Sequence, residues 1–130
     1  MPQPRAIVKD QGGIRAGLNS TGTTIAIHRI VKKATTAVDT ITPAVDGAAL
    51  PYGVTMAAIL DGYAGDVQVE GRAIVEAGVA ITIGQKITGG TGGKAAVATA
   101  AQFIIGEAAS AASADGQLFE VDLNPGVVPA

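Results

Sequence analysis

Short runs of β-branched and small apolar residues, divided by glycines, recur about every eight to twelve residues from residue 54 onward. The clearest run, residues 66–78 (DVQVEGRAIVEAG), places Val67, Val69, Gly71, Ala73 and Val75 on one face and polar residues, joined by Ile74, on the other. Alternation with a period of two indicates a strand. Short strands at such regular spacing are typical of a small barrel or sandwich. The sequence therefore predicts an all-β, barrel- or sandwich-like domain with little helix and no internal repeat.

The apolar content of the chain consists mostly of small side chains. Hydrophobic residues make up 48% of the 130 residues, but only two are Tyr, two are Phe and none is Trp. Aromatic side chains normally supply much of the buried area of a core. Because Ala, Val and Ile take their place, we expect thin layers, closely spaced backbones and a fold that relies on neighbouring subunits.

The first half of the chain is less regular and divides it into an arm and a body. Residues 1–23, punctuated by Pro and Gly, predict an extended N-terminal arm, and residues 24–130 predict the β-rich domain. Within this domain, residues 24–33 predict the first strand and residues 34–53 a long loop. Residues 124–130 predict a tail that two prolines keep out of the sheet.

Charge is distributed unevenly along the chain. Residues 1–33 carry six basic groups against one acidic group, a net charge of +5, and residues 34–130 carry three against ten, a net charge of −7. A basic arm on an acidic body suggests contact with an acidic partner, which can be nucleic acid, a protein surface or an adjacent copy of the chain. The alternative interpretation is that the excess charge only keeps this segment soluble.

The residues that the chain lacks narrow the possible classes of protein. There is no cysteine, which excludes disulfides, thiolate metal sites and thiol nucleophiles. The N-terminal residues contain no uninterrupted apolar segment of the kind that signal peptides carry, and no window reaches the ~18 apolar residues of a membrane span. We therefore expect a protein made in the cytoplasm, with no membrane partner.

The segment GGTGGK, residues 89–94, is the stretch most similar to a nucleotide-binding loop. A Walker A loop needs Gly, four residues and then Gly-Lys-Ser/Thr. Here three residues separate Gly89 from Gly93, and Ala95 follows Lys94. The residues after the loop predict a strand, whereas a phosphate site of this kind needs a helix N-terminus. The segment therefore predicts a hairpin connection and no nucleotide cofactor.

No other pattern indicates catalysis or metal binding. His28 is the single histidine, and the carboxylates lack the spacing of a calcium loop. The basic residues are not interleaved with aromatic side chains, which disfavours a stacking platform for single-stranded nucleic acid. We expect no enzymatic activity, no catalytic residues, no metal and no cofactor.

Six short motifs follow one another in the second half of the chain. They are Glu76-Ala77-Gly78, AITIG at Ala80–Gly84, Gly92-Gly93-Lys94, IIGEA at Ile104–Ala108, the connector Ser110–Gly116 and Val121-Asp122-Leu123. In this order they resemble the layout of the capsid cement, or head decoration, proteins of tailed bacteriophages. The resemblance covers roughly 55 of the 130 residues, positions 69–123.

This resemblance implies a non-enzymatic virion protein with a small β-rich fold. Such proteins commonly bind as homotrimers to the outside of the head, at local three-fold positions, and stabilise the expanded shell. The implied partner is the major capsid protein, with no direct contact to nucleic acid. An extended N-terminal segment often touches the shell in this family, and the candidate capsid contacts in that segment are Arg5, Ile7, Val8, Lys9 and Arg15.

Two other functions remain open from the sequence. One is a lipoyl- or biotinyl-type carrier domain, modified at Lys94, although the common Met-Lys pair is absent. The other is a different β-rich virion component, such as a tail-tube or fibre protein.

Overall fold

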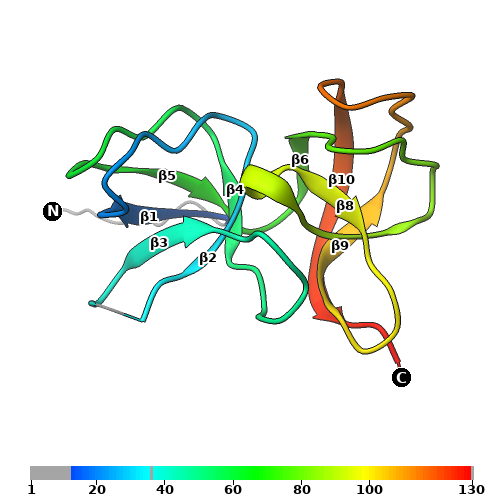
Figure 1. Cartoon of the computed structure of the whole chain (residues 1–130), viewed down its shortest axis with the longest axis horizontal. Coiled ribbons are helices and arrows are strands. Elements are labelled where there is room, and N and C mark those ends of the chain that lie inside the picture. The colour runs from blue at the N-terminus through cyan, green and yellow to red at the C-terminus, as the bar shows by residue number, and fades with distance from the viewer. Residues whose placement is uncertain (1–12, 36, 130) are drawn as a thin grey trace, which may run out of the picture.

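The computed structural model describes residues 13–35 and 37–129, which form ten strands arranged in two lobes (Figure 1). The strands are β1 Ile14–Asn19, β2 Ile30–Lys33, β3 Thr40–Pro43, β4 Gly53–Thr55, β5 Ala64–Gln68, β6 Arg72–Glu76, β7 Lys86–Gly89, β8 Ala95–Val97, β9 Phe103–Ala108 and β10 Leu118–Val127. A 3-10 turn at Thr91–Gly93 is the one helical element within these ranges, so none of the described helices is long enough to cross a membrane. The prediction of an all-β fold with little helix is confirmed.

The N-terminal lobe, residues 14–68, is a closed five-stranded barrel with the strand order β1-β3-β2-β4-β5. Its strands pair antiparallel except β1 and β3, which are parallel. The C-terminal lobe, residues 72–127, is a five-stranded sheet with the order β6-β10-β9-β7-β8. The bridge between Ala77 and Ala95 brings the two ends of this sheet together, so the sheet curls into a nearly closed ring.

The two lobes have the same topology. In the N-terminal lobe β1 pairs with β5, β2 with β3 and β4, and β4 with β5. In the C-terminal lobe β6 pairs with β10, β7 with β8 and β9, and β9 with β10, always antiparallel as in the first lobe. The parallel contact recurs as well, as Asn19–Ile41 in one lobe and Ala77–Ala95 in the other. Strands β1 to β5 therefore correspond, in order, to strands β6 to β10.

Backbone hydrogen bonds outside the strands match pair by pair. Those of the N-terminal lobe join Ile25 to Ile59, His28 to Thr55 and Gly62 to Asn19, and their counterparts join Ile81 to Ala112, Gly84 to Ala108 and Gly116 to Ala77. These matches define which residue of one lobe corresponds to which residue of the other. The chain is thus an internal duplication of one five-stranded unit, and the prediction of no internal repeat is wrong.

A continuous core crosses the boundary between the lobes. Ile30, Ala44 and Val54 come from the N-terminal lobe but are buried in the same cluster as Ile105 and Val121 of the C-terminal lobe. A second, smaller cluster fills the N-terminal barrel; it consists of Ile25, Val31, Ile41, Ile59 and Val67. The largest fully buried hydrophobic side chains are Ile and Val, in agreement with the expected core of small side chains.

The expected first strand, residues 24–33, is divided by a turn at His28. Its φ of 66° lies in the left-handed region, and its N–H donates to the carbonyl oxygen of Thr55 at 3.1 Å. The strand therefore begins only at Ile30, and the expected loop at residues 34–53 contains β3.

Two more local expectations are corrected by the structure. The alternating run at residues 66–78 belongs to two strands, β5 and β6, because Gly71 forms a turn with φ 85° between the lobes. Strand β10 continues to Val127, within the segment expected to be a tail. Pro125 lies where the register between β10 and β9 shifts, a position at which a missing N–H is tolerated.

The expected N-terminal arm is only partly described. Residues 1–12, including the candidate contacts Arg5, Ile7, Val8 and Lys9, lie outside the described residues. Residues 14–19 form β1, which is hydrogen-bonded between β3 and β5 in the barrel.

Candidate functional site

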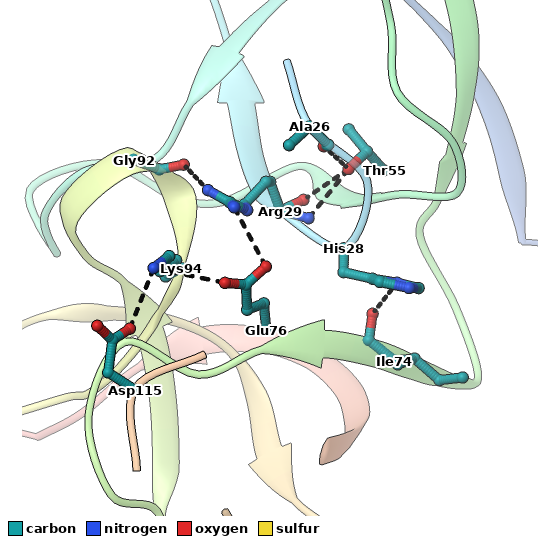
Figure 2. Close-up of polar contacts among 9 residues, drawn as sticks. All are labelled: Ala26, His28, Arg29, Thr55, Ile74, Glu76, Gly92, Lys94 and Asp115. Atoms are coloured by element: carbon teal, nitrogen blue, oxygen red, sulfur yellow. Dashed lines mark hydrogen bonds and ion pairs between the residues drawn. The ribbon is translucent and has the colours of Figure 1, made fainter. Parts of the chain in front are cut away.

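Four charged side chains meet where the two lobes join (Figure 2). Arg29 Nη2 lies 3.1 Å from Glu76 Oε1, and Lys94 Nζ lies 3.4 Å from Glu76 Oε2 and 3.0 Å from Asp115 Oδ1. Arg29 Nη1 also donates to the carbonyl oxygen of Gly92 at 3.2 Å. Arg29 belongs to the N-terminal lobe and its partners belong to the C-terminal lobe, so this ion network ties the lobes together.

The backbone at Arg29 is fixed by Thr55 in the neighbouring strand. Arg29 N–H donates to the Thr55 hydroxyl at 3.0 Å, and that hydroxyl donates to the carbonyl oxygen of Ala26 at 2.8 Å. Across the lobe boundary, His28 Nδ1 lies 3.2 Å from the carbonyl oxygen of Ile74. Because a carbonyl only accepts, this contact is a hydrogen bond in the tautomer that carries its proton on Nδ1. These contacts fix the backbone from which the Arg29 side chain extends to Glu76.

A groove of about 640 Å³ lies beside this network. Its walls come from β7, β8 and the segment Val45–Gly47, and Arg29, Lys94 and Asp115 border it. Thr88 also lines the groove; its buried hydroxyl has no hydrogen-bond partner within the described part of the chain. Gly and Ala supply seven of the seventeen described lining residues, and no serine or histidine is among them.

The GGTGGK segment forms the connection between β7 and β8, which pair antiparallel. Gly90 N–H donates to the carbonyl oxygen of Lys94 at 2.7 Å, and Gly93 N–H donates back to that of Gly90 at 2.9 Å. The loop therefore uses backbone N–H groups to close its own turn, where a phosphate-binding loop would direct them at a ligand. The prediction of a hairpin connection is confirmed.

The ammonium group of Lys94 is held by two carboxylates. Hydrogen bonding to Asp115, and next to Glu76, raises the pKa of Lys94 above its usual value. The side chain is 27% exposed. A carrier lysine offers its amine for covalent modification, whereas this amine is kept protonated and paired, which disfavours the carrier interpretation.

Replacing Asp115 by Asn is expected to lower the pKa of Lys94 towards that of an ordinary lysine, because Asp115 makes the largest contribution to the shift. A raised pKa contributes stability at pH values below about 10.4, and this contribution is lost as the pH rises through the folded-state value. An NMR titration of the Lys94 Cε–Hε signals measures the change. Asp46→Asn, which removes another carboxylate at the edge of the groove, is the control and should leave that titration unchanged.

The described ion pairs of this network do not include any of the candidate capsid contacts. Arg15, the described member of the five candidate capsid contacts, is exposed on β1. Within residues 13–35 and 37–129, no three His, Asp or Glu side chains lie close enough to hold a metal ion. The network itself was not predicted, because Arg29, Glu76 and Asp115 are far apart in the sequence and share no motif.

The fold is similar to that of a known phage protein, although no protein-family model and no curated protein match the chain. The solved structure of the N base of the head fiber gp8.5 of bacteriophage phi29 superimposes with a TM-score of 0.69 and 19% sequence identity. The match covers 85% of this chain and 92% of the phage chain. At this identity the likeness establishes the shared fold.

Proposed function

We propose that the chain is a non-enzymatic structural protein of a phage virion that attaches to the outer surface of the head. The observation that carries this proposal is the extent of the structural likeness, which spans 85% of this chain and nearly all of a head fiber base. Because one fold can serve many functions, the likeness gains weight from the cement-like motifs at residues 69–123, which are independent of it. The attachment partner is the major capsid protein.

In this proposal the protein acts by adhesion. Packaged DNA pushes the capsid subunits apart, and a protein that bridges several subunits adds contact area across their joints. A stable interface buries about 1,600 Å² in total. Three copies bound together as a trimer at a local three-fold position would bind with avidity, because one released copy is recaptured before the others leave.

The proposed capsid contacts are Arg5, Ile7, Val8 and Lys9, together with Arg15 at the start of the barrel. The segment RAIVK has the composition of a strand, and a strand added to a sheet edge of the shell would bind through backbone hydrogen bonds. Its basic residues would pair with acidic residues of the capsid.

A head-binding experiment tests the proposal. Purified protein is mixed with expanded and unexpanded heads that lack it, and both are imaged by cryo-electron microscopy. We expect regular density on the outside of the expanded heads at local three-fold positions. Heads that remain bare at saturating protein concentration would contradict the proposal.

The same experiment with a variant that lacks residues 2–12 tests the arm. This variant keeps β1, so it should fold and assemble like the intact chain but bind expanded heads more weakly. Binding of equal strength would remove the arm from the mechanism and leave the head-surface function intact.

The likeness to a fiber base favours a second candidate within the same class. In this case the protein would anchor a longer fibre to the head, and the density would carry a projecting stalk. A compact knob of density would instead indicate a decoration protein.

A further inference from the structure

A second groove, of about 460 Å³, lies on the N-terminal lobe beside β2 and β3. Lys32 and Lys33 line it, together with the hydroxyl-bearing side chains of Ser20, Thr35 and Thr42. Among the described residues that line this groove there is no Asp or Glu. The groove therefore presents positive charge and hydrogen-bond donors.

The two lysines differ from the cations of the ion network in having no described partner. Within the described residues, no carboxylate lies within 4.0 Å of Lys32 or Lys33, whereas Arg29 and Lys86 each have one such partner and Lys94 has two. These two charges are thus available to a ligand.

The Tyr52 ring contacts Lys33, and a third cation, Arg15, lies near the same ring. The ammonium of Lys33 lies 5.2 Å from the centroid of the Tyr52 ring, within the range of a cation–π contact. Burial raises the pKa of Tyr52, Arg15 lowers it and Asp39 raises it, so the charges of Arg15 and Asp39 both lie near this ring. We call Arg15, Lys32 and Lys33 the basic surface; with Asp39 included it keeps a net positive charge.

The duplicated fold allows these cations to be compared with the equivalent positions of the C-terminal lobe. The register of the paired strands makes Ala73 the counterpart of Arg15, Thr88 that of Lys32 and Gly89 that of Lys33. All three counterparts are uncharged, although the C-terminal lobe has a groove in the equivalent place, lined by Thr88 and Gly89. The three counterparts are buried, whereas Arg15 and Lys33 are exposed, so the N-terminal lobe presents charge to the surface at positions that the C-terminal lobe buries.

We propose that the basic surface is the docking site for an acidic segment of the shell protein on the phage head. This inference rests on the proposed head-surface function and deepens it by naming the face that meets the shell. A protein segment fits better than nucleic acid, because affinity for duplex DNA comes largely from neutralising many phosphates with Lys and Arg, and this surface has few cations. Two lysines that line the groove, with Arg15 near the Tyr52 ring, suit the side chains of one or two acidic residues and their backbone.

The test compares two variants that each remove two positive charges. In Lys32→Thr/Lys33→Ala, Thr is the residue at the equivalent position of the other lobe, and Ala keeps strand geometry. In Arg72→Ala/Lys86→Thr, the charges are removed from exposed positions of the C-terminal lobe. Thermal unfolding of both variants, followed by circular dichroism, first establishes that they are folded.

Affinity for expanded heads is then measured by co-sedimentation at low and at physiological salt. We expect the first variant to lose roughly tenfold in affinity at low salt, with a weaker salt dependence, because complementary charge steers and holds the complex. The second variant should stay within about twofold of the unmodified protein. Equal binding by both variants, or a larger loss in the second, would overturn the inference while the head-surface function stands.

If the unmodified protein does not bind heads, the proposed function fails and the shell protein is no longer the partner, but binding of an acidic protein segment to the basic surface can still be tested. An NMR titration with hexaglutamate peptide should then shift the amide signals of Lys32, Lys33 and Ser20, and the shifts should vanish at high salt. Absent shifts, shifts confined to the C-terminal lobe, or shifts caused by a short DNA duplex and not by the peptide would overturn the inference.

Discussion

Gly89→Ala is expected to lower the free energy of unfolding by about 3 kcal/mol, because the new methyl group has no space. A Cβ at Gly89 would overlap the carbonyl oxygen of Ala44 and lie 2.7 Å from the Ala44 Cβ. Strand β7 cannot move aside, since it is paired with β8 on one edge and β9 on the other. Ala44 is fixed as well, because its N–H donates to the carbonyl oxygen of Ile30 at 2.9 Å.

Urea unfolding measures this change, and Gly126→Ala is the matched control. Gly126 also lies in a strand, but a Cβ there would meet no atom within 4 Å. The control should stay within about 0.5 kcal/mol of the unmodified protein. If the two variants unfold at the same urea concentration, the close packing of β7 against Ala44 is disproved.

Ile30→Ala is expected to cost about 3 kcal/mol and to destabilise both lobes together. Ile30 is fully buried, and although its strand belongs to the N-terminal barrel, its side chain packs in the core that continues into the C-terminal lobe. The cavity would thus open in the packing that the lobes share. Ile83→Ala, at a site where the side chain is 65% exposed, should change stability little.

The positions of the tyrosines allow unfolding of the N-terminal lobe to be compared with unfolding of the whole chain. Tyr52 and Tyr63 are the two tyrosines of the chain, and both lie in the N-terminal lobe. Tyrosine fluorescence therefore reports on that lobe, whereas far-ultraviolet circular dichroism reports on all strands. We expect the two signals to change at the same urea concentration, before and after the substitution. Separate transitions would show that the lobes unfold independently.

The sequence predicted those strands in which buried apolar side chains alternate with exposed polar ones. Phe119 and Val121 alternate with charged residues in β10, and both are buried as that pattern requires. The turn at His28 was missed because the residues around it favour a strand. Its left-handed conformation depends on the hydrogen bond to Thr55, a contact distant in sequence.

The duplication could not be predicted because strand register depends on backbone hydrogen bonds, which most side chains permit. Equivalent positions such as Arg15 and Ala73 have unrelated side chains. Few identities remain, and the pair Asp61-Gly62 and Asp115-Gly116 is one of them. Glycine recurs there because both turns need a positive φ, 85° at Gly62 and 91° at Gly116. An identity of two residues is too short to distinguish from the many glycine turns in the chain.

The candidate site escaped prediction for a related reason. Arg29, Glu76 and Lys94 meet only because the two lobes pack together, and no local pattern encodes that packing. The charge imbalance at residues 1–33 was visible in the sequence. That two of these basic residues, Lys32 and Lys33, line a groove, with Lys33 against the Tyr52 ring, required the fold.

A chain built from two copies of one ring can divide its tasks. Because Ile30, Ala44 and Val54 anchor the first copy in the packing of the second, the second copy acts as a foundation for the first. The exposed side chains of the N-terminal lobe can then change, because its strands stay packed against the C-terminal lobe. A new specificity can thus arise on one half of the molecule without any loss of the architecture that both halves maintain.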